Sequence, residues 1–220
     1  QAERLVNSEF AREISMDSLK SGATILGIGD AGGFRQFSNS VRMIRRPEDL
    51  KGLKMRSNGM DTINKTLEAL GAEVMTVPYN DLYMALKSGA IDGQENPWVN
   101  SSGMRFYEVQ KYFTEVNYQF HPEPFYVNTR WYESLPSEYQ EILAECTEEM
   151  MKENNRLIDE NEVQAMENIR ANAEIYTLSR EERQAFVEAT QVVYEEYMDN
   201  GLLTMDDLAR MKRIIRGEEK

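Results

Sequence analysis

An arginine in the middle of an apolar stretch is the first residue of this sequence that suggests chemistry. Arg56 lies in residues 53–57, where Leu53, Met55 and Ser57 share one face of a predicted strand and Arg56 points to the other. A guanidinium group donates two parallel hydrogen bonds to a carboxylate, so a strand arginine can grip an organic acid. Many strand arginines only lay their stems along apolar surface, so this interpretation needs further residues.

Three further residues fall where such a site needs them. Arg35 follows a glycine-rich stretch, Asn96 comes just past another predicted strand, and Tyr79 follows the end of a third. Parallel α/β sheets bind ligands in the crevice outside the carboxyl ends of their strands. We therefore predict a carboxylate site built on Arg56 and Asn96, with Arg35 and Tyr79 in support. Tyr79 is equally open to a role as an aromatic residue that packs in a turn.

Catalytic and metal sites find less support. His121 is the only histidine and Cys146 the only cysteine, so a zinc site would need mostly carboxylates and an intrachain disulfide is excluded. We expect Cys146 to be a buried thiol on the apolar stripe of a helix. Glu95 is the only carboxylate beside the predicted site, and an enzyme that acts on a carboxylate substrate would depend on it. We predict no metal and no cofactor.

The glycines of residues 27–33 resemble a phosphate loop but lack its Gly-Lys-Ser/Thr ending. We expect them to form a flexible turn between a strand and a crossover.

The elements that must position the site alternate in the first half of the chain. Strands are predicted at 23–28, 53–57, 73–77 and 90–93, and helices at 62–70 and 81–88, with Asp61 and Asn80 as N-caps. This β-α-β-α-β order indicates a parallel α/β layer. One helix is expected at 3–20.

The second half is mainly helical. Residues 137–173 contain no Gly and no Pro and repeat apolar residues at close to 3.6 positions, which predicts one long helix. Strands are expected at 125–129 and 175–178. A helix is expected to follow Ser179, which forms a capping-box pattern with Glu182, and to continue to Asn200. The last predicted helix is 205–216.

The charge of the chain limits its partners. Its 220 residues carry 25 Lys and Arg against 38 Asp and Glu, a net charge of −13. An acidic chain of this kind does not suit a nucleic-acid backbone or an anionic membrane surface. No apolar run is long enough to span a bilayer, and no signal peptide opens this sequence, so we expect no direct membrane insertion.

An ordered set of motifs closely resembles the solute receptors of tripartite ATP-independent periplasmic (TRAP) transporters, in their dicarboxylate and sugar-acid binding branch. The set comprises GFRQFSN at 33–39, RPEDLKGLKMR at 46–56, LGA at 70–72, VPYNDLYMAL at 77–86, DGQENP at 92–97, FYEVQKY at 106–112 and WYESL at 131–135. The resemblance covers nearly the whole chain. It implies an α/β fold of periplasmic binding protein-like (type II) lobes, with the long helix as a scaffold behind both.

The resemblance also implies roles for single residues. Arg56 matches the arginine that forms a paired salt bridge with the ligand carboxylate, Arg35 a supporting arginine, and Asn96 the asparagine on the same carboxylate. Tyr79 takes a position usually held by Phe that packs on the ligand. Tyr83 matches a motif tyrosine whose role is as readily structural as functional. With Glu95, these residues form the predicted ligand-binding set.

The implied function is that of a periplasmic, non-enzymatic receptor. It would capture a dicarboxylate, keto acid or sugar acid and deliver it to the membrane subunits of a TRAP transporter. An enzyme or an acidic helical interaction module remains the alternative.

Family members begin with a signal peptide and further β-α units, so we expect the N-terminal part of the first lobe to be missing. Residues 38–116 would then form the second lobe, and 1–37 with 117–220 the remnant of the first.

Overall fold

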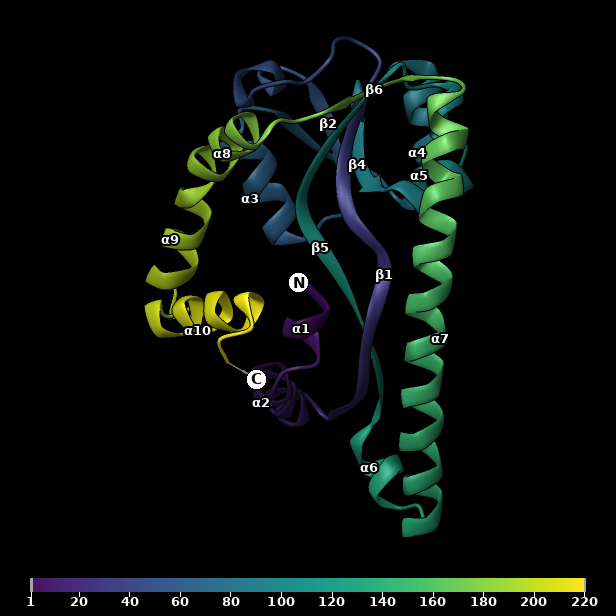
Figure 1. The fold of residues 1–220 in the computed structure, drawn as a ribbon, viewed down its shortest axis with the longest axis vertical. Helices are drawn as coiled ribbons and strands as arrows, with labels where there is room; N and C mark the ends of the chain where they lie inside the picture. Colours follow the sequence, from purple (N-terminus) through teal and green to yellow (C-terminus); the bar gives the residue numbers. More distant parts are fainter. Residues whose placement is uncertain (1, 220) are drawn as a thin grey trace. The chain divides into compact units, whose positions relative to one another are not determined.

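The computed structural model describes residues 2–219, and these form two compact units. Unit 1 holds residues 2–31, 121–160 and 203–219, and unit 2 holds 32–120 and 161–202. Two strands and one helix, β1 (Ala23–Asn39), β5 (Tyr112–Asn128) and α7 (Ser137–Arg170), have residues in both units, and Figure 1 lets the reader follow each along the chain. These units differ from the predicted division, because 161–202 group with 32–120. The predicted lobes of the receptor stay a prediction.

Unit 1 begins with two short helices in place of the single helix expected at 3–20. Helix α1 (Ala2–Val6) ends before Ser8, whose hydroxyl accepts a hydrogen bond from the Ala11 amide at 3.2 Å and so begins α2 (Glu9–Asp17). A 3-10 turn, η1 (Ser18–Ser21), follows. The prediction of one helix was wrong because an internal serine caps the second segment.

Strand β1 is much longer than predicted, and it includes the glycines that were expected to form a turn. Gly27 and Gly29 allow close packing within unit 1. A Cβ atom on Gly29 would lie 2.5 Å from the sulfur of Met151 on α7. Strand β1 continues through Arg35 to Asn39, so the residues of GFRQFSN are strand residues.

The sheet has six strands in the order β3-β2-β4-β1-β5-β6. Strand β2 (Lys54–Ser57) pairs in parallel with β3 (Glu73–Thr76) and with β4 (Gly93–Pro97), as the alternation of strands and helices predicted. Strand β1 joins antiparallel to β4, with Arg35 opposite Pro97 and Phe37 opposite Glu95. The register therefore brings Arg35, Arg56 and residues 94–96 onto three adjacent strands.

The helices between these strands lie close to their predicted positions. Helix α3 (Asp61–Ala69) and helix α4 (Tyr79–Ser88) begin after Met60 and Pro78. Neither Asp61 nor Asn80 is the N-cap, because each already lies inside its helix. Proline favours this entry, since its fixed φ suits the start of a helix. A 3-10 turn, η2 (Pro47–Leu50), precedes β2.

Strand β4 was predicted at 90–93 but runs from Gly93 to Pro97. A Cβ atom on Gly93 would lie 2.4 Å from the Ser38 carbonyl oxygen, so glycine permits the close approach of β1. The polar residues Gln94, Glu95 and Asn96 are consequently buried strand residues. Helix α5 (Trp98–Gly103) and the turn η3 (Phe106–Glu108) follow.

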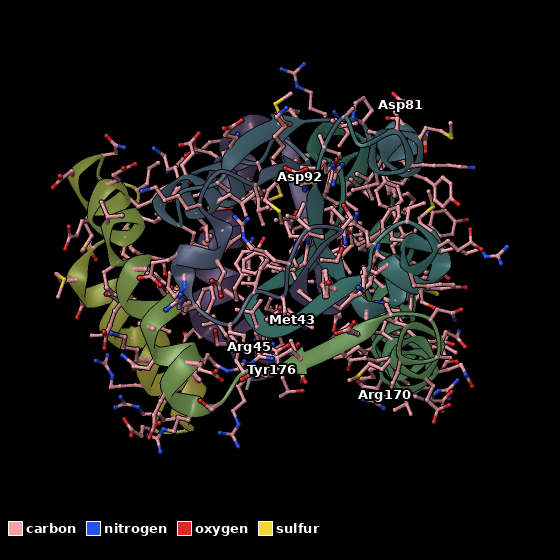
Figure 2. All side chains as sticks on the ribbon, turned by 90° about the horizontal axis from the view of Figure 1, so that it is seen from above. Met43, Arg45, Asp81, Asp92, Arg170 and Tyr176 are labelled. Carbon is pink, nitrogen blue, oxygen red and sulfur yellow. The ribbon has the colours of Figure 1, made fainter. Side chains whose placement is uncertain are left out.

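The second half begins with β5, which starts well before the predicted strand at 125–129. Helix α6 (Thr129–Glu133), the long α7 and β6 (Glu174–Thr177) follow. Strand β6 pairs in parallel with the start of β5. Figure 2 shows Arg45 next to Tyr176 of this strand, and the Arg45 guanidinium carbon lies 4.5 Å from the centroid of the Tyr176 ring.

The predicted helix from Ser179 to Asn200 is divided at Thr190 into α8 (Arg180–Ala189) and α9 (Gln191–Asp199). The capping box of Ser179 and Glu182 is present, as predicted. The Thr190 hydroxyl donates to the Phe186 carbonyl at 2.8 Å, a local bond that competes with helix propagation. The last helix, α10 (Met205–Arg216), matches its prediction.

In the part of the chain that the structure describes, three clusters of buried apolar residues form the core, and all of them lie in unit 2. The largest joins Phe37 to Met55 and to Leu67 of α3. A second surrounds Leu82 and Phe106, and a third surrounds Trp98 and Phe113. Strand β2 is thus held by packed side chains such as Met55, and β4 is held by pairing with β1 and β2.

Candidate functional site

Strand β2 holds Arg56 inside unit 2, opposite Gln94 of β4 and Met75 of β3. Its side chain is buried, with 3 % of the residue's surface exposed. The Nε atom donates a hydrogen bond to the Val77 carbonyl at 2.9 Å. This bond fixes the plane of the guanidinium group and leaves its two terminal nitrogens for another partner.

No carboxylate among the described residues forms an ion pair with Arg56. Burial lowers the pKa of Arg56, while the charge of nearby Glu95 acts in the opposite direction and that of Arg35 adds to the lowering. A buried cation without a paired anion costs folding free energy, so such groups are found where a ligand supplies the anion. The terminal nitrogens of Arg56 are therefore able to pair with an anionic group.

Tyr79, at the start of α4, lies against this arginine. Its ring centroid is 5.9 Å from the Arg56 guanidinium carbon, and its hydroxyl is 3.5 Å from the Asn100 carbonyl oxygen. Burial raises the pKa of Tyr79, so the phenol stays protonated. The structure thus brings together two of the predicted site residues, Arg56 and Tyr79, in a cation–π contact.

Arg35 is also buried, but its guanidinium group already has a carboxylate partner. Its Nε and Nη2 atoms bond the two carboxylate oxygens of Glu95, the second at 2.9 Å, and Nη2 also donates to the Glu95 carbonyl at 2.9 Å. Burial lowers the pKa of Arg35, but the bonds and charge of Glu95 outweigh this and raise it overall. Arg35 therefore forms an internal ion pair with Glu95, and this pair lies close to Arg56.

Asn96 joins the same network from β4. Its Oδ1 atom accepts a hydrogen bond from Nη2 of Arg35 at 3.1 Å, and its Nδ2 atom donates to Oε1 of Gln94 at 2.5 Å. Gln94 donates in turn to the Ser38 hydroxyl at 2.8 Å. Asn96 was predicted just past a strand end, but it lies within the strand, where β1 and β4 provide its partners.

Tyr118 belongs to this network and was not predicted from the sequence. Its hydroxyl donates to Oε2 of Glu95 at 2.5 Å, and its ring stacks on Phe37 with centroids 4.9 Å apart. Burial and the neighbouring Glu95 charge raise the pKa of Tyr118 well above its usual value. The strand was not recognised before residue 125, and Asn117, with φ of 50°, interrupts the alternation that could have revealed it.

Tyr83 is not brought to this group. Its hydroxyl donates to Oε2 of Glu108 at 2.7 Å, and its ring packs in the cluster around Leu82 and Phe106. These contacts suit the structural role that the sequence left open for it.

Two other features bear on alternative sites. Cys146 is exposed, so the expectation of a buried thiol was wrong: the residue lies on the outer face of α7. Across residues 2–219, no cluster of His, Cys, Asp and Glu could hold a metal ion. No described helix combines the length and the apolar character needed to cross a bilayer.

Comparison with known proteins shows which family this chain matches. The family described as bacterial extracellular solute-binding protein, family 7, matches residues 1–200. The chain belongs to this family. Its members bind solutes, in agreement with the prediction of a binding protein rather than an enzyme, and the resemblance to TRAP receptors is confirmed.

Relatives whose names state what they bind are similar to this chain over part of their own length. The C4-dicarboxylate-binding periplasmic protein DctP of Vibrio cholerae is 31 % identical over 169 residues, which are 75 % of this chain and 50 % of that protein. The C4-dicarboxylate-binding protein DctB of Bacillus subtilis is 27 % identical over 167 residues. The chain spans about half the length of these curated relatives.

Solved structures of the family share the fold. A TRAP periplasmic solute-binding protein from Ralstonia eutropha, with bound (S)-2-acetolactate, superposes with a TM-score of 0.91 at 31 % identity, covering 98 % of this chain and 70 % of that one. Another from Shewanella oneidensis, with bound succinate, has a TM-score of 0.84 at 28 % identity, covering 90 % and 65 %. The predicted periplasmic binding protein-like fold of this family-7 chain is thereby confirmed.

Proposed function

We propose that this chain is the carboxylate-gripping part of an extracytoplasmic receptor that captures a small organic acid. Arg56 forms two parallel hydrogen bonds with the ligand carboxylate, and Tyr79 packs against it. Arg35 and Asn96 support the same carboxylate, and Glu95 holds Arg35 in place. In the periplasm, the receptor then delivers its ligand to the membrane subunits of a TRAP transporter.

One observation carries this proposal: Arg56 is buried, oriented by Val77 and without a carboxylate partner among the described residues. A guanidinium group in a dry site binds a carboxylate about twice as strongly as a neutral hydrogen bond would. The bound acid would supply the negative charge that unit 2 does not offer to Arg56. The site would therefore be most stable when occupied.

The relatives support the class of ligand and the compartment. Their names and bound molecules include C4-dicarboxylates, succinate and acetolactate, all of which carry a carboxylate. The Vibrio cholerae relative is named as a periplasmic protein. By analogy we infer a periplasmic location and a carboxylic acid ligand for this chain.

The test is a substitution series in the full-length protein, measured by calorimetry against succinate, acetolactate and galacturonate. Arg56→Ala should weaken binding of the acid that the wild type accepts by about 2 kcal/mol or more, roughly 30-fold. Arg56→Lys should also bind poorly, because an ammonium group lacks the planar fork. Lys54→Ala, two residues away at the exposed start of β2, is the matched control and should bind normally.

Circular dichroism must show the native fold in each variant. Unchanged affinity in a folded Arg56→Ala protein would disprove the assignment of the site. Loss of affinity in Lys54→Ala would show that general charge, and not the buried arginine, attracts the acid.

A further inference from the structure

The connection between β2 and α3 contains two neighbouring residues that can react with each other. Asn58 is followed by Gly59, one of two Asn-Gly pairs in the sequence. Asn58 is exposed, and Gly59 has a φ of 90°, in the left-handed region that favours glycine. Because glycine has no Cβ atom, its amide nitrogen can approach the preceding side chain closely. The Asn58 side chain is therefore open to attack by the backbone of its own chain.

Hydrogen bonds prepare the Asn58 side chain for this attack. The Met60 amide donates to Oδ1 of Asn58 at 3.0 Å, where it stabilises the negative charge that develops when a nucleophile adds to Cγ. The Gly59 amide donates to the Ser57 hydroxyl at 2.8 Å. The nitrogen that must lose its proton is thus bonded to a side chain and takes no part in a helix or strand ladder. Since Asn58 is exposed, ammonia can leave and water can enter.

The second Asn-Gly pair, Asn200 and Gly201, is held differently. Asn200 is the C-cap of α9 with nearly helical backbone angles, and its amide donates to the Glu196 carbonyl at 3.1 Å. The Gly201 amide donates to the Met198 carbonyl at 3.0 Å, so an attack by this nitrogen would break the last turn of the helix. The two pairs share a sequence and differ in local structure, and we expect Asn58 to react faster.

We propose that Asn58 is a site of spontaneous covalent modification, at which the Gly59 nitrogen converts the side-chain amide to a carboxylate. This nitrogen loses its proton and bonds to Cγ of Asn58, the bond between Cγ and Nδ2 breaks, and Nδ2 leaves as ammonia. Water then opens the resulting cyclic succinimide at either of its two carbonyl carbons. The products are aspartate and isoaspartate, and isoaspartate has the side-chain CH₂ group inserted into the main chain. The reaction consumes water, releases ammonia and needs no oxidant.

The new carboxylate would lie beside the candidate site. Residues two apart in a strand point to the same face and are separated by about 7 Å, so position 58, just past the end of β2, continues the row of Arg56. A negative charge at this distance repels an incoming carboxylate and should weaken its binding about threefold or more. This consequence rests on the proposed function, whereas the covalent reaction does not.

The test follows the full-length protein during incubation at neutral and at mildly alkaline pH. Peptide mass spectrometry locates each conversion of amide to acid, and an isoaspartyl methyltransferase labels the isoaspartate. Conversion at Asn58 should exceed that at Asn200 in the folded protein, and it should become faster as the pH rises, because the attacking nitrogen must be deprotonated. In urea the two rates should become nearly equal, because only the shared Asn-Gly sequence is left.

Three variants separate the reaction from its effect on binding. Asn58→Gln has a longer side chain that closes a larger ring more slowly, so it should lose the label and keep the wild-type fold and affinity. Asn200→Gln is the matched control and should leave the label at Asn58 unchanged. Asn58→Asp has the charge of the product. Calorimetry with succinate, acetolactate and galacturonate should show its loss of affinity for whichever acid the wild type binds.

The outcomes are distinguishable. Conversion no faster at Asn58 than at Asn200 in the folded protein would overturn the inference, as would a label that persists in Asn58→Gln. Wild-type affinity in both the aged protein and Asn58→Asp would overturn the link to ligand binding. If the wild type binds none of the acids while Asn58 is converted, the proposed function fails and the modification stands.

Discussion

The two units of this chain differ sharply in how much apolar side chain they bury. Among the described residues, all the buried apolar residues except Phe10 and Ile214 lie in unit 2. Both units expose large apolar side chains, such as Met16 and Trp131 in unit 1 and Met84 and Leu202 in unit 2. In unit 1, one ion pair links α10 to α2, between Arg210 and Glu13, and Arg210 also pairs with Glu219, which follows α10.

The difference explains where a binding site can be built. A buried arginine must be held by a rigid, close-packed surrounding, since otherwise it would move out into water. Unit 2 provides this surrounding for Arg35 and Arg56. In unit 1, Arg210 makes comparable ion pairs at the surface, where solvent and salt weaken them. Arginine is thus buried in a close-packed surrounding in unit 2 and linked to carboxylates at the surface in unit 1.

The largest expected effect comes from breaking the core of unit 2. Phe37→Ala should lower the free energy of unfolding by about 4 kcal/mol, because Phe37 is fully buried against Tyr118 and Phe186. Phe10→Ala, in unit 1, is the comparison and should cost less. Denaturant unfolding followed by circular dichroism measures both. Equal losses would contradict the contrast between the units.

The next effect comes from breaking the buried ion pair. Arg35→Met leaves Glu95 buried without its counter-charge, and we expect a loss of about 3 kcal/mol in the free energy of unfolding. The double variant Arg35→Met with Glu95→Leu removes both charges and should recover most of that loss. A double variant no more stable than the single one would show that the pair itself supports the fold.

A smaller effect, of opposite sign, is expected at the neighbouring arginine. Arg56→Met removes a buried cation that no described carboxylate pairs with, so the free energy of unfolding should be unchanged or raised by about 1 kcal/mol. Thermal unfolding without ligand compares it with Arg35→Met. A loss as large as that of Arg35→Met would mean that Arg56 has a structural partner, and would weaken the case for a ligand site.

The surface ion pairs of unit 1 should matter least. Arg210→Ala should lower the melting temperature only slightly, and high salt should remove the difference from the wild type, because exposed pairs are screened. Arg35→Met should keep its deficit in the same salt. Persistence of the Arg210→Ala deficit in high salt would indicate that this pair is effectively buried.

A titration tests the link between α3 and α9 in unit 2. Burial, with the hydrogen bond to Asp61, raises the pKa of Tyr197 to about 12. A raised tyrosine pKa stabilises the fold fully below the unfolded pKa of about 10, and this contribution is lost as the pH rises toward 12. The ultraviolet titration of Tyr197→Phe should lack a component near pH 12 that the wild type shows.

Much of the fold was predictable from local patterns. The parallel pairing of β2 with β3 and β4, the long α7 and the capping box of α8 all follow from periodicity, glycines and a cap, which act over a few residues. The predicted strand bounds were wrong where contacts with segments far away in the sequence determine the structure. Strand β1 continues through its glycines because α7 packs on them, and β4 lies at 93–97 because β1 pairs there.

In the candidate site too, local sequence patterns predicted some features and contacts between distant segments determined the others. The sequence by itself determined that Arg56 is a strand arginine, with Tyr79 and Asn96 near neighbouring strand ends, because strand periodicity is local. Only the tertiary structure decided that Glu95 pairs with Arg35 and leaves Arg56 without a carboxylate. That choice depends on the register of β1 with β4 and on Tyr118 from β5, contacts between segments far apart in the chain. The distances between Glu95 and the two arginines in the folded chain decide which arginine it pairs with, and these distances cannot be derived from the residue types alone.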